Sequence, residues 1–148
     1  MLLLRVVVVI AVLVLATGLG LWWNARNGRF TVRDSAQRAT APRVSAAELG
    51  AALGGELTFL QFSSEVCAPC RRAAVVLGQL ATERPGLAHV EIDVVEHLDL
   101  VRRFDVMRTP TVLLLDTDGV VVGRMSGALD RRHALAALES CPGTVSAR

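Results

Sequence analysis

Two cysteines three positions apart, Cys67 and Cys70, are the residues of this chain best suited to carry out chemistry. Only Ala68 and Pro69 separate them, within the stretch FSSEVCAPCRR. Such a pair can hold a metal, cycle between a dithiol and a disulfide, or lie inert in a core. The elements that position the pair decide among these three possibilities.

A strand is predicted to end just before the pair and a helix to begin at it. Residues 57–62, LTFLQF, have the β-branched and aromatic content of a strand, and residues 67–86 have helical spacing. Cys67 then starts a helix, where unpaired N–H groups and the helix dipole stabilise a thiolate. Cys70, one turn later, can close a disulfide with that sulfur, and Pro69 is compatible with a first helical turn. The spacing therefore favours redox chemistry.

A structural metal site would need two further ligands. The candidates are Cys141 and three histidines, His89, His97 and His133. None of them belongs to a second C-x-x-C or to a closely spaced histidine pair, so a zinc site is disfavoured. Because the cysteine count is odd, at least one thiol is unpaired within the chain, and we interpret Cys141 as a bystander.

The remaining pattern predicts a small α/β sandwich. A capping box at Ser45 and Glu48 opens a helix expected to run to Gly54 and Gly55. The other expected elements are a strand at 88–92, a helix at 97–104, a hairpin of strands 111–116 and 120–125 around Asp118-Gly119, and a helix at 130–139 capped by Asp130. The first two strands, joined through a helix, should run parallel, and the hairpin should be antiparallel.

An uncharged run of 18 residues, 6–23, precedes these elements and ends in Trp22 and Trp23. As a helix it would be about 27 Å long, close to the thickness of a bilayer core. The two tryptophans suit a membrane interface. We interpret the run as an uncleaved anchor; a cleaved signal peptide, with Ala16-Thr17-Gly18 as a poor cleavage site, is the alternative.

Charge is unevenly distributed along the chain, which has 16 arginines and no lysine. Up to Val44 there are six arginines and one acidic residue, and from Ser45 onward there are ten arginines and thirteen acidic residues. This distribution disfavours a nucleic-acid-binding face and fits a basic collar beside an anionic membrane. Five arginines follow the apolar run and only Arg5 precedes it, which favours a cytoplasmic domain, with an extracytoplasmic domain as the alternative.

Taken together, the motifs resemble the thioredoxin family. The resemblance covers residues 45–139 and depends on Cys67-Ala-Pro-Cys70 after an apolar strand, Arg108-Thr-Pro110-Thr before VLLLD, Asp118-Gly119, and Ser126-Gly127-Ala128. It implies a thioredoxin-like three-layer sandwich with a mixed central sheet, here preceded by one N-terminal transmembrane helix. It also implies that Cys67 is the attacking thiol, Cys70 the resolving thiol and Pro110 a cis-proline beside them. The implied substrate-contacting residues are Val66, Ala68, Pro69 and Thr109.

Four positions depart from the pattern of the family. Val66 replaces the usual tryptophan before the first cysteine, and Ala68 replaces the usual glycine after it. Gln61 stands where the family has a buried acid that helps to deprotonate the resolving thiol, and an amide cannot act as that base. His89 stands at the position of a nearby lysine. Gln61 and His89 are therefore the residues to consider for a proton relay.

The sequence thus predicts four segments: a transmembrane anchor at 2–23, an Arg-rich linker at 24–44 in which Phe30-Thr31-Val32 can form a short strand, a thioredoxin-like domain at 45–140 and a tail at 141–148. The predicted function is that of a membrane-tethered thiol–disulfide oxidoreductase. Its partners would be disulfide-containing proteins, an upstream thiol reductant and the lipid bilayer, with no cofactor, metal or nucleic acid. The alternative is a redox-inactive or regulatory thioredoxin-fold binding module at the membrane, which Gln61 and Val66 favour.

Overall fold

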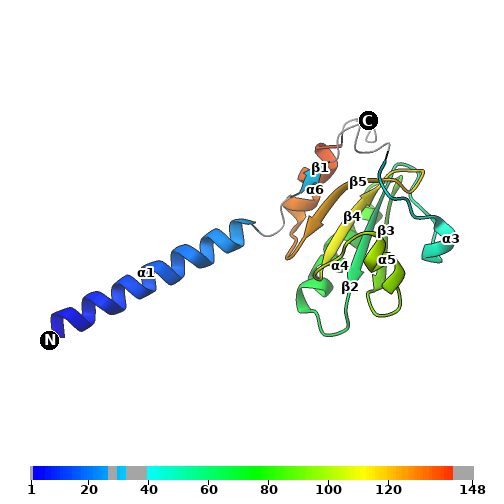
Figure 1. Cartoon of the computed structure of the whole chain (residues 1–148). Helices are drawn as coiled ribbons and strands as arrows, with labels where there is room; N and C mark the ends of the chain where they lie inside the picture. The colour runs from blue at the N-terminus through cyan, green and yellow to red at the C-terminus, as the bar shows by residue number, and fades with distance from the viewer. Residues whose placement is uncertain (1, 27–29, 33–39, 142–148) are drawn as a thin grey trace.

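A mixed β-sheet covered by helices forms the centre of the domain, and a long helix precedes it (Figure 1). The computed structural model describes residues 2–26, 30–32 and 40–141. The elements in chain order are α1 (Leu2–Arg26), β1 (Thr31–Val32), α3 (Ala46–Leu49), β2 (Leu57–Ser63), α4 (Ala68–Glu83), β3 (Leu87–Asp93), α5 (Leu98–Arg103), β4 (Thr111–Leu115), β5 (Val121–Ser126) and α6 (Arg131–Glu139). Of the predicted linker and tail, residues 27–29, 33–39 and 142–148 lie outside the described residues.

The strands lie in the order β1-β5-β4-β2-β3. Strand β2 pairs in parallel with β3 from Leu57↔Leu87 to Ser63↔Asp93, and antiparallel with β4 on its other side. Strands β4 and β5 form the antiparallel hairpin. The predicted parallel pair and the predicted hairpin are both confirmed. The two-residue strand β1 extends this four-stranded mixed sheet at the β5 edge.

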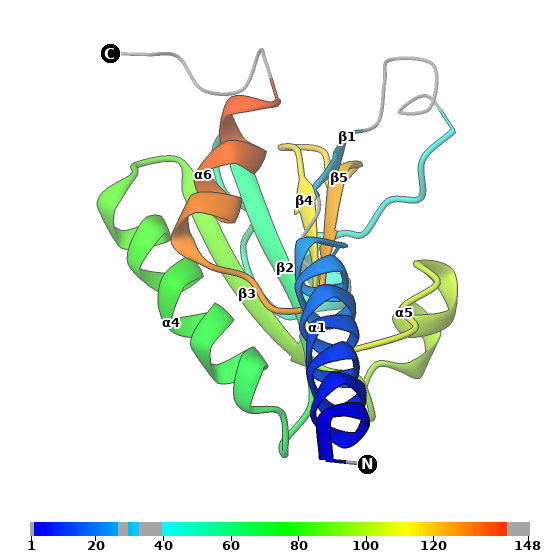
Figure 2. The same ribbon diagram turned by 90° about the vertical axis from the view of Figure 1, so that its left-hand side faces the viewer.

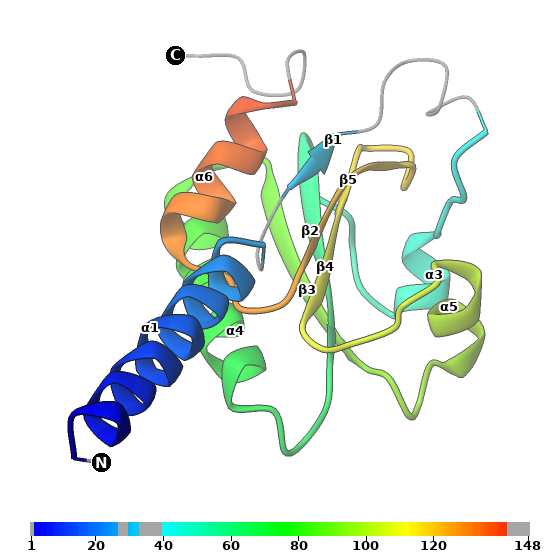
Figure 3. The ribbon, with the colours of Figure 1, turned by 60° about the vertical axis from the view of Figure 1, so that its left-hand side comes forward.

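Two apolar clusters fill the space between the sheet and its helices. One joins β2, β4 and β5 to buried residues of α4 and α6, including Leu77 and Leu138. The other joins the opposite face to α3 and α5, through Leu49 and Leu100. Figures 2 and 3 show α4 and α6 on one side of the sheet and α5 on the other, and Figure 3 shows α3 beside α5, so the domain has three layers.

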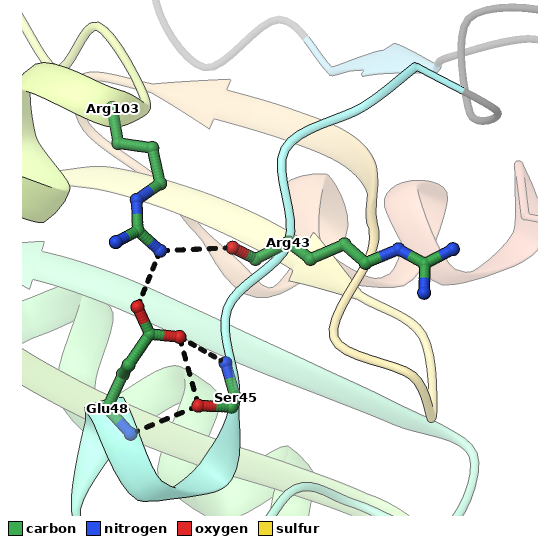
Figure 4. A network of polar contacts seen from close by, with 4 residues as sticks. All are labelled: Arg43, Ser45, Glu48 and Arg103. Atoms are coloured by element: carbon green, nitrogen blue, oxygen red, sulfur yellow. Dashed lines mark hydrogen bonds and ion pairs between the residues drawn. The ribbon is translucent and has the colours of Figure 1, made fainter.

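The predicted capping box begins helix α3. The Ser45 hydroxyl accepts from the Glu48 N–H at 3.3 Å, and the Ser45 N–H donates back to the Glu48 carboxylate at 2.9 Å (Figure 4). The helix ends at Gly50 rather than at Gly54 and Gly55, which corrects the expected boundary. Gly50 adopts a left-handed conformation, φ 62°, and its N–H bonds back to the carbonyls of the first turn, which closes the helix after four residues.

Helix α1 spans 25 residues. Within it, Leu3–Trp22 has a mean hydropathy of 2.6, and none of this segment is buried against the rest of the described chain. Its length and composition suit a membrane span, and a signal sequence near an N-terminus has the same properties.

Candidate active site

Cys67 is the N-cap of helix α4. Its sulfur accepts a hydrogen bond from the Cys70 N–H at 3.2 Å, and its carbonyl accepts from the Arg71 N–H at 3.3 Å. Pro69 lies in the first turn, where its missing N–H leaves no helical bond unmade. The predicted strand–helix junction is thus confirmed. The N–H groups and dipole of a helix start stabilise negative charge on a sulfur placed there.

The two cysteines form a disulfide, with a Cα–Cα distance of 5.2 Å. Cys67 is partly exposed, whereas Cys70 is fully buried. In the reduced chain, an incoming disulfide can therefore reach the sulfur of Cys67 but not that of Cys70. This asymmetry is what a two-thiol exchange needs, because one sulfur must meet the partner and the other must wait behind it.

The loop before β4 lies beside the loop that carries the cysteines. The Thr109 hydroxyl is 3.4 Å from the Ser64 hydroxyl, and the Cys67 N–H donates to the Ser64 carbonyl at 3.2 Å. The Thr109–Pro110 peptide bond is cis, as the resemblance implied, and Pro110 is buried. Val66 is 94% exposed, and Ala68 and Pro69 are exposed as well. The residues predicted to contact substrate are therefore at one end of the domain, and their roles stay predictions.

Behind the cysteines, the buried Gln61 amide makes three hydrogen bonds. Its Nε2 donates to the Cys70 carbonyl and to Glu91 Oε1, both at 3.0 Å. Its Oε1 lies 3.2 Å from His89 Nε2. Since both Gln61 N–H groups are used, Oε1 accepts and His89 carries a proton on Nε2. An amide bonded in this way fixes the first turn of α4 against β2.

Comparison with known proteins identifies the family. The thioredoxin family model matches residues 47–140. Among curated proteins, Thioredoxin H5 from Oryza sativa subsp. japonica is 38% identical over 61 residues, 41% of this chain and 45% of that protein. A thioredoxin from Mycobacterium tuberculosis is 37% identical over 70 residues, 47% of this chain and 60% of that protein.

This chain belongs to the thioredoxin family. The fold agrees with that assignment: a mutant thioredoxin from Halobacterium salinarum NRC-1 superposes with a TM-score of 0.54 at 24% identity, covering 64% of this chain and 80% of that one. The chain spans about half the length of the first curated relatives that it matches, 45% and 56%.

The sequence prediction of this thioredoxin site did not include Glu91. Glu91 lies directly opposite Gln61 in the parallel register of β2 and β3. The sequence contains a signal for Glu91, because His89 and Glu91 are two positions apart on one strand and therefore face the same side of the sheet. Only the pairing of β3 with β2 shows that this side meets Gln61.

His89 lies against helix α4. A Cβ added to Gly78 would be 3.9 Å from its Nδ1, so the imidazole packs where the helix has no side chain. Burial lowers the pKa of His89, and the nearby Glu91 carboxylate opposes this shift. The neutral imidazole is therefore the form that the fold favours.

The other residues considered for chemistry lie on different elements. Cys141 takes no part in the Cys67–Cys70 disulfide and is 3% exposed, in the apolar cluster of α4 and α6. His97 is the N-cap residue of α5 but makes no capping bond with its side chain, whose Nδ1 lies 3.1 Å from the Asp93 carbonyl. His133 lies in the first turn of α6 beside Asp130. Within the described ranges, no three His, Cys, Asp or Glu side chains gather as metal ligands would.

Alkylation of the reduced chain should distinguish the three thiols. We expect Cys67 to be labelled first near neutral pH, because Cys70 is fully buried and Cys141 is 3% exposed. Peptide mapping by mass spectrometry at short reaction times measures the order. Faster labelling of Cys70 would reverse the roles of the two cysteines.

Gln61→Glu tests the hydrogen-bonded amide. The substitution replaces two donated bonds with a carboxylate beside Glu91, so we expect a loss of about 1–3 kcal/mol in unfolding free energy. Burial and the neighbouring charge raise the pKa of such a carboxyl group, so the loss should grow as pH rises above about 4. Urea unfolding of the full chain in detergent micelles, followed by circular dichroism, gives the values.

Glu91→Gln is the matched partner in a double-mutant cycle with Gln61→Glu. It removes the opposing charge. The loss of unfolding free energy in the double variant should therefore be smaller than the sum of the losses in the two single variants, by about 1 kcal/mol. Strict additivity would show that Gln61 and Glu91 do not interact.

His89 should make the stability of the domain depend on pH. Its pKa is lower in the folded chain than in the unfolded chain, so the unfolded state binds more protons as pH falls below about 6.5. Stability should therefore be full above that pH and decrease as pH falls toward the folded pKa. We expect His89→Gln to reduce the loss of stability between pH 7.5 and 5, measured by urea unfolding. The control is His133→Gln, on the surface of α6; an equal effect of the two substitutions would contradict the assignment to His89.

Proposed function

We propose that this chain is a thioredoxin-type thiol–disulfide oxidoreductase that reduces disulfides in partner proteins and is held at a membrane by α1. One observation supports the activity most directly. Cys67, which is partly exposed at the start of a helix, forms a disulfide bond with the buried Cys70. Family membership supports the same chemistry.

The reaction follows from the accessibility of the two sulfurs. The Cys67 thiolate attacks a disulfide in the partner, forming a mixed disulfide and releasing one partner sulfur as a thiolate that takes up a proton. The Cys70 sulfur, having given up its proton, then attacks Cys67 Sγ, closes the Cys67–Cys70 disulfide and releases the second partner sulfur. Two electrons pass from the dithiol to the partner, and an upstream dithiol reductant restores the pair. Every bond that forms or breaks joins sulfur atoms of Cys67, Cys70 and the partner, and no other side chain of this chain forms a covalent bond.

Residues at the exposed end of the domain would receive the partner. Val66, Ala68 and Pro69 are exposed neighbours of Cys67 along the chain, and Thr109 lies on the loop next to Ser64. Gln61 would position the first turn of α4 through the Cys70 carbonyl rather than move protons, because both of its N–H groups are already donated. His89 would fix the Gln61 amide from its other end.

The membrane part of the proposal depends on the apolar segment of α1. Leu3–Trp22 is long enough to span a bilayer, and the described domain buries none of it. Arginines outnumber acidic residues just after it, which favours a cytoplasmic domain. A cleaved signal peptide is the competing explanation, and it would leave the redox domain free of the membrane.

A redox-inactive binding module at the membrane is the second candidate function. The observation that favours it is the uncharged Gln61, which leaves no carboxylate buried beside Cys70 among the described residues. Such a module would keep the fold and the disulfide but would not turn over.

One experiment tests the activity and the tether together. Membrane pellets from cells expressing the full chain are washed with alkaline carbonate and assayed for reduction of insulin with dithiothreitol. We expect insulin reduction to remain in the pellet and to be lost in Cys67→Ser, because the attacking thiol is then absent. The control Cys141→Ser should retain nearly full activity, since that thiol is buried in the core.

Other outcomes of this assay contradict separate parts of the proposal. A shortened chain in the soluble fraction would indicate a cleaved signal peptide. An intact chain in the pellet with no insulin reduction would favour the binding module.

A further inference from the structure

Strand β1 belongs to the redox domain although it lies only a few residues after α1. Thr31 pairs with Arg124 and Val32 with Gly123, antiparallel to β5, and Figure 3 shows β1 beside β5. The Phe30 ring lies over Gly123, where an added Cβ would overlap the ring. Phe30 is half-buried and packs against the apolar cluster of α4 and α6. Backbone pairing and ring packing therefore both attach residues 30–32 to the sheet edge.

The segment just before α3 is attached to the domain as well. Arg43 forms a β-bridge with Val120, and the Val44 N–H donates to the Gly119 carbonyl at 3.1 Å. Arg103 of α5 donates to the Arg43 carbonyl at 3.3 Å and to the Glu48 carboxylate at 2.6 Å (Figure 4). The Ser45 N–H and the Arg103 guanidinium, both bonded to the Glu48 carboxylate, lower the pKa of Glu48 to about 2.

The attached segments leave only residues 27–29 between helix α1 and the domain. Whatever their conformation, the chain from Arg26 to Phe30 spans at most about 14 Å. From Trp22, the end of the apolar segment, to Arg26 the helix rises about 6 Å. A free linker over all of residues 24–44 would instead reach about 70 Å. The sheet edge at β5 is therefore within about 20 Å of the end of the apolar segment.

We propose that the docking of residues 30–32 on β5 holds the redox domain close to the bilayer, so that its partners are disulfides of membrane-attached proteins lying near the bilayer surface. This inference rests on the proposed membrane tether and on the proposed reductase activity. Figure 1 shows α1 leading away from the domain, so the apolar segment is free to enter a bilayer while the domain lies next to it.

The test uses the full chain in lipid vesicles and two synthetic substrates. Each substrate is a peptide disulfide coupled to a lipid headgroup, one through a two-residue spacer and one through 30 prolines, which hold it about 90 Å from the headgroup. The readout is the ratio of initial reduction rates for the short and long substrates. We expect the unaltered chain to favour the short substrate by about tenfold, because a tether that cannot span the distance gives almost no effective concentration.

Two variants, each with the same insertion of 20 Gly/Ser residues at a different place, test whether residues 30–32 are docked on β5 or belong to a free linker. Placed between residues 26 and 27, the insertion lengthens the tether, and we expect the rate ratio to fall toward one. Placed between residues 36 and 37, it lies between two attached segments, and the ratio should stay as in the unaltered chain. Phe30→Ser removes the ring over Gly123 and should shift the ratio in the same direction as the first insertion.

The matched insertions also identify the result that would overturn the inference. If both insertions change the ratio equally, residues 30–32 do not hold the domain and the inference is wrong. Reduction of soluble insulin by the same vesicles is measured in parallel and should be equal in all variants. Loss of insulin reduction in the unaltered chain would instead contradict the proposed activity, and release of the chain from the vesicles would contradict the tether.

Discussion

The site depends on the burial of β2 between two apolar layers and two neighbouring strands. All seven residues of Leu57–Ser63 are buried, Phe59 in the cluster of α4 and Phe62 in the cluster of α5. Paired with β3 and β4, the strand cannot shift without disturbing both clusters. Because α4 returns the chain from β2 to the parallel strand β3, its N-terminus must lie at the end of β2. That constraint places Cys67 at a helix cap.

The parts of the fold that the sequence predicted well are those with local signals. The cysteine pair after an apolar strand, the capping box at Ser45 and the Asp118-Gly119 turn each depend on a few neighbouring residues, and the structure has all three. The sequence predicts an end of α3 that is too late, because glycines that can stop a helix occur at Gly50, Gly54 and Gly55. Gly50 closes the helix, while Gly54 packs against the backbone at Leu57 and Gly86, where no side chain would fit.

The contacts that the sequence could not predict join segments far apart in the chain. Glu91 is bonded to Gln61, 30 residues earlier in the sequence. The Phe30 ring lies over Gly123, which follows it much later in the sequence. A charged residue on a strand is ordinarily a solvated side chain, and an aromatic residue in an arginine-rich segment has no periodic pattern around it. Each acquires its role only through strand pairing, β3 on β2 and β1 on β5. Register is a tertiary property, so these partners lay beyond local rules.

The Gln61 amide changes what the proposed reaction requires rather than preventing it. In the second step Cys70 loses a proton while a partner thiolate is released, and that thiolate can accept a proton. The proton that Cys70 loses can therefore pass through water to the partner thiolate. The reaction then needs no permanent base behind the cysteines. A buried carboxylate would carry a desolvation cost there, whereas the amide satisfies the Cys70 carbonyl and leaves the negative charge on Glu91, which is exposed to water. The uncharged site thus gives up a nearby proton acceptor and keeps the hydrogen bond that holds the first turn of α4 in place.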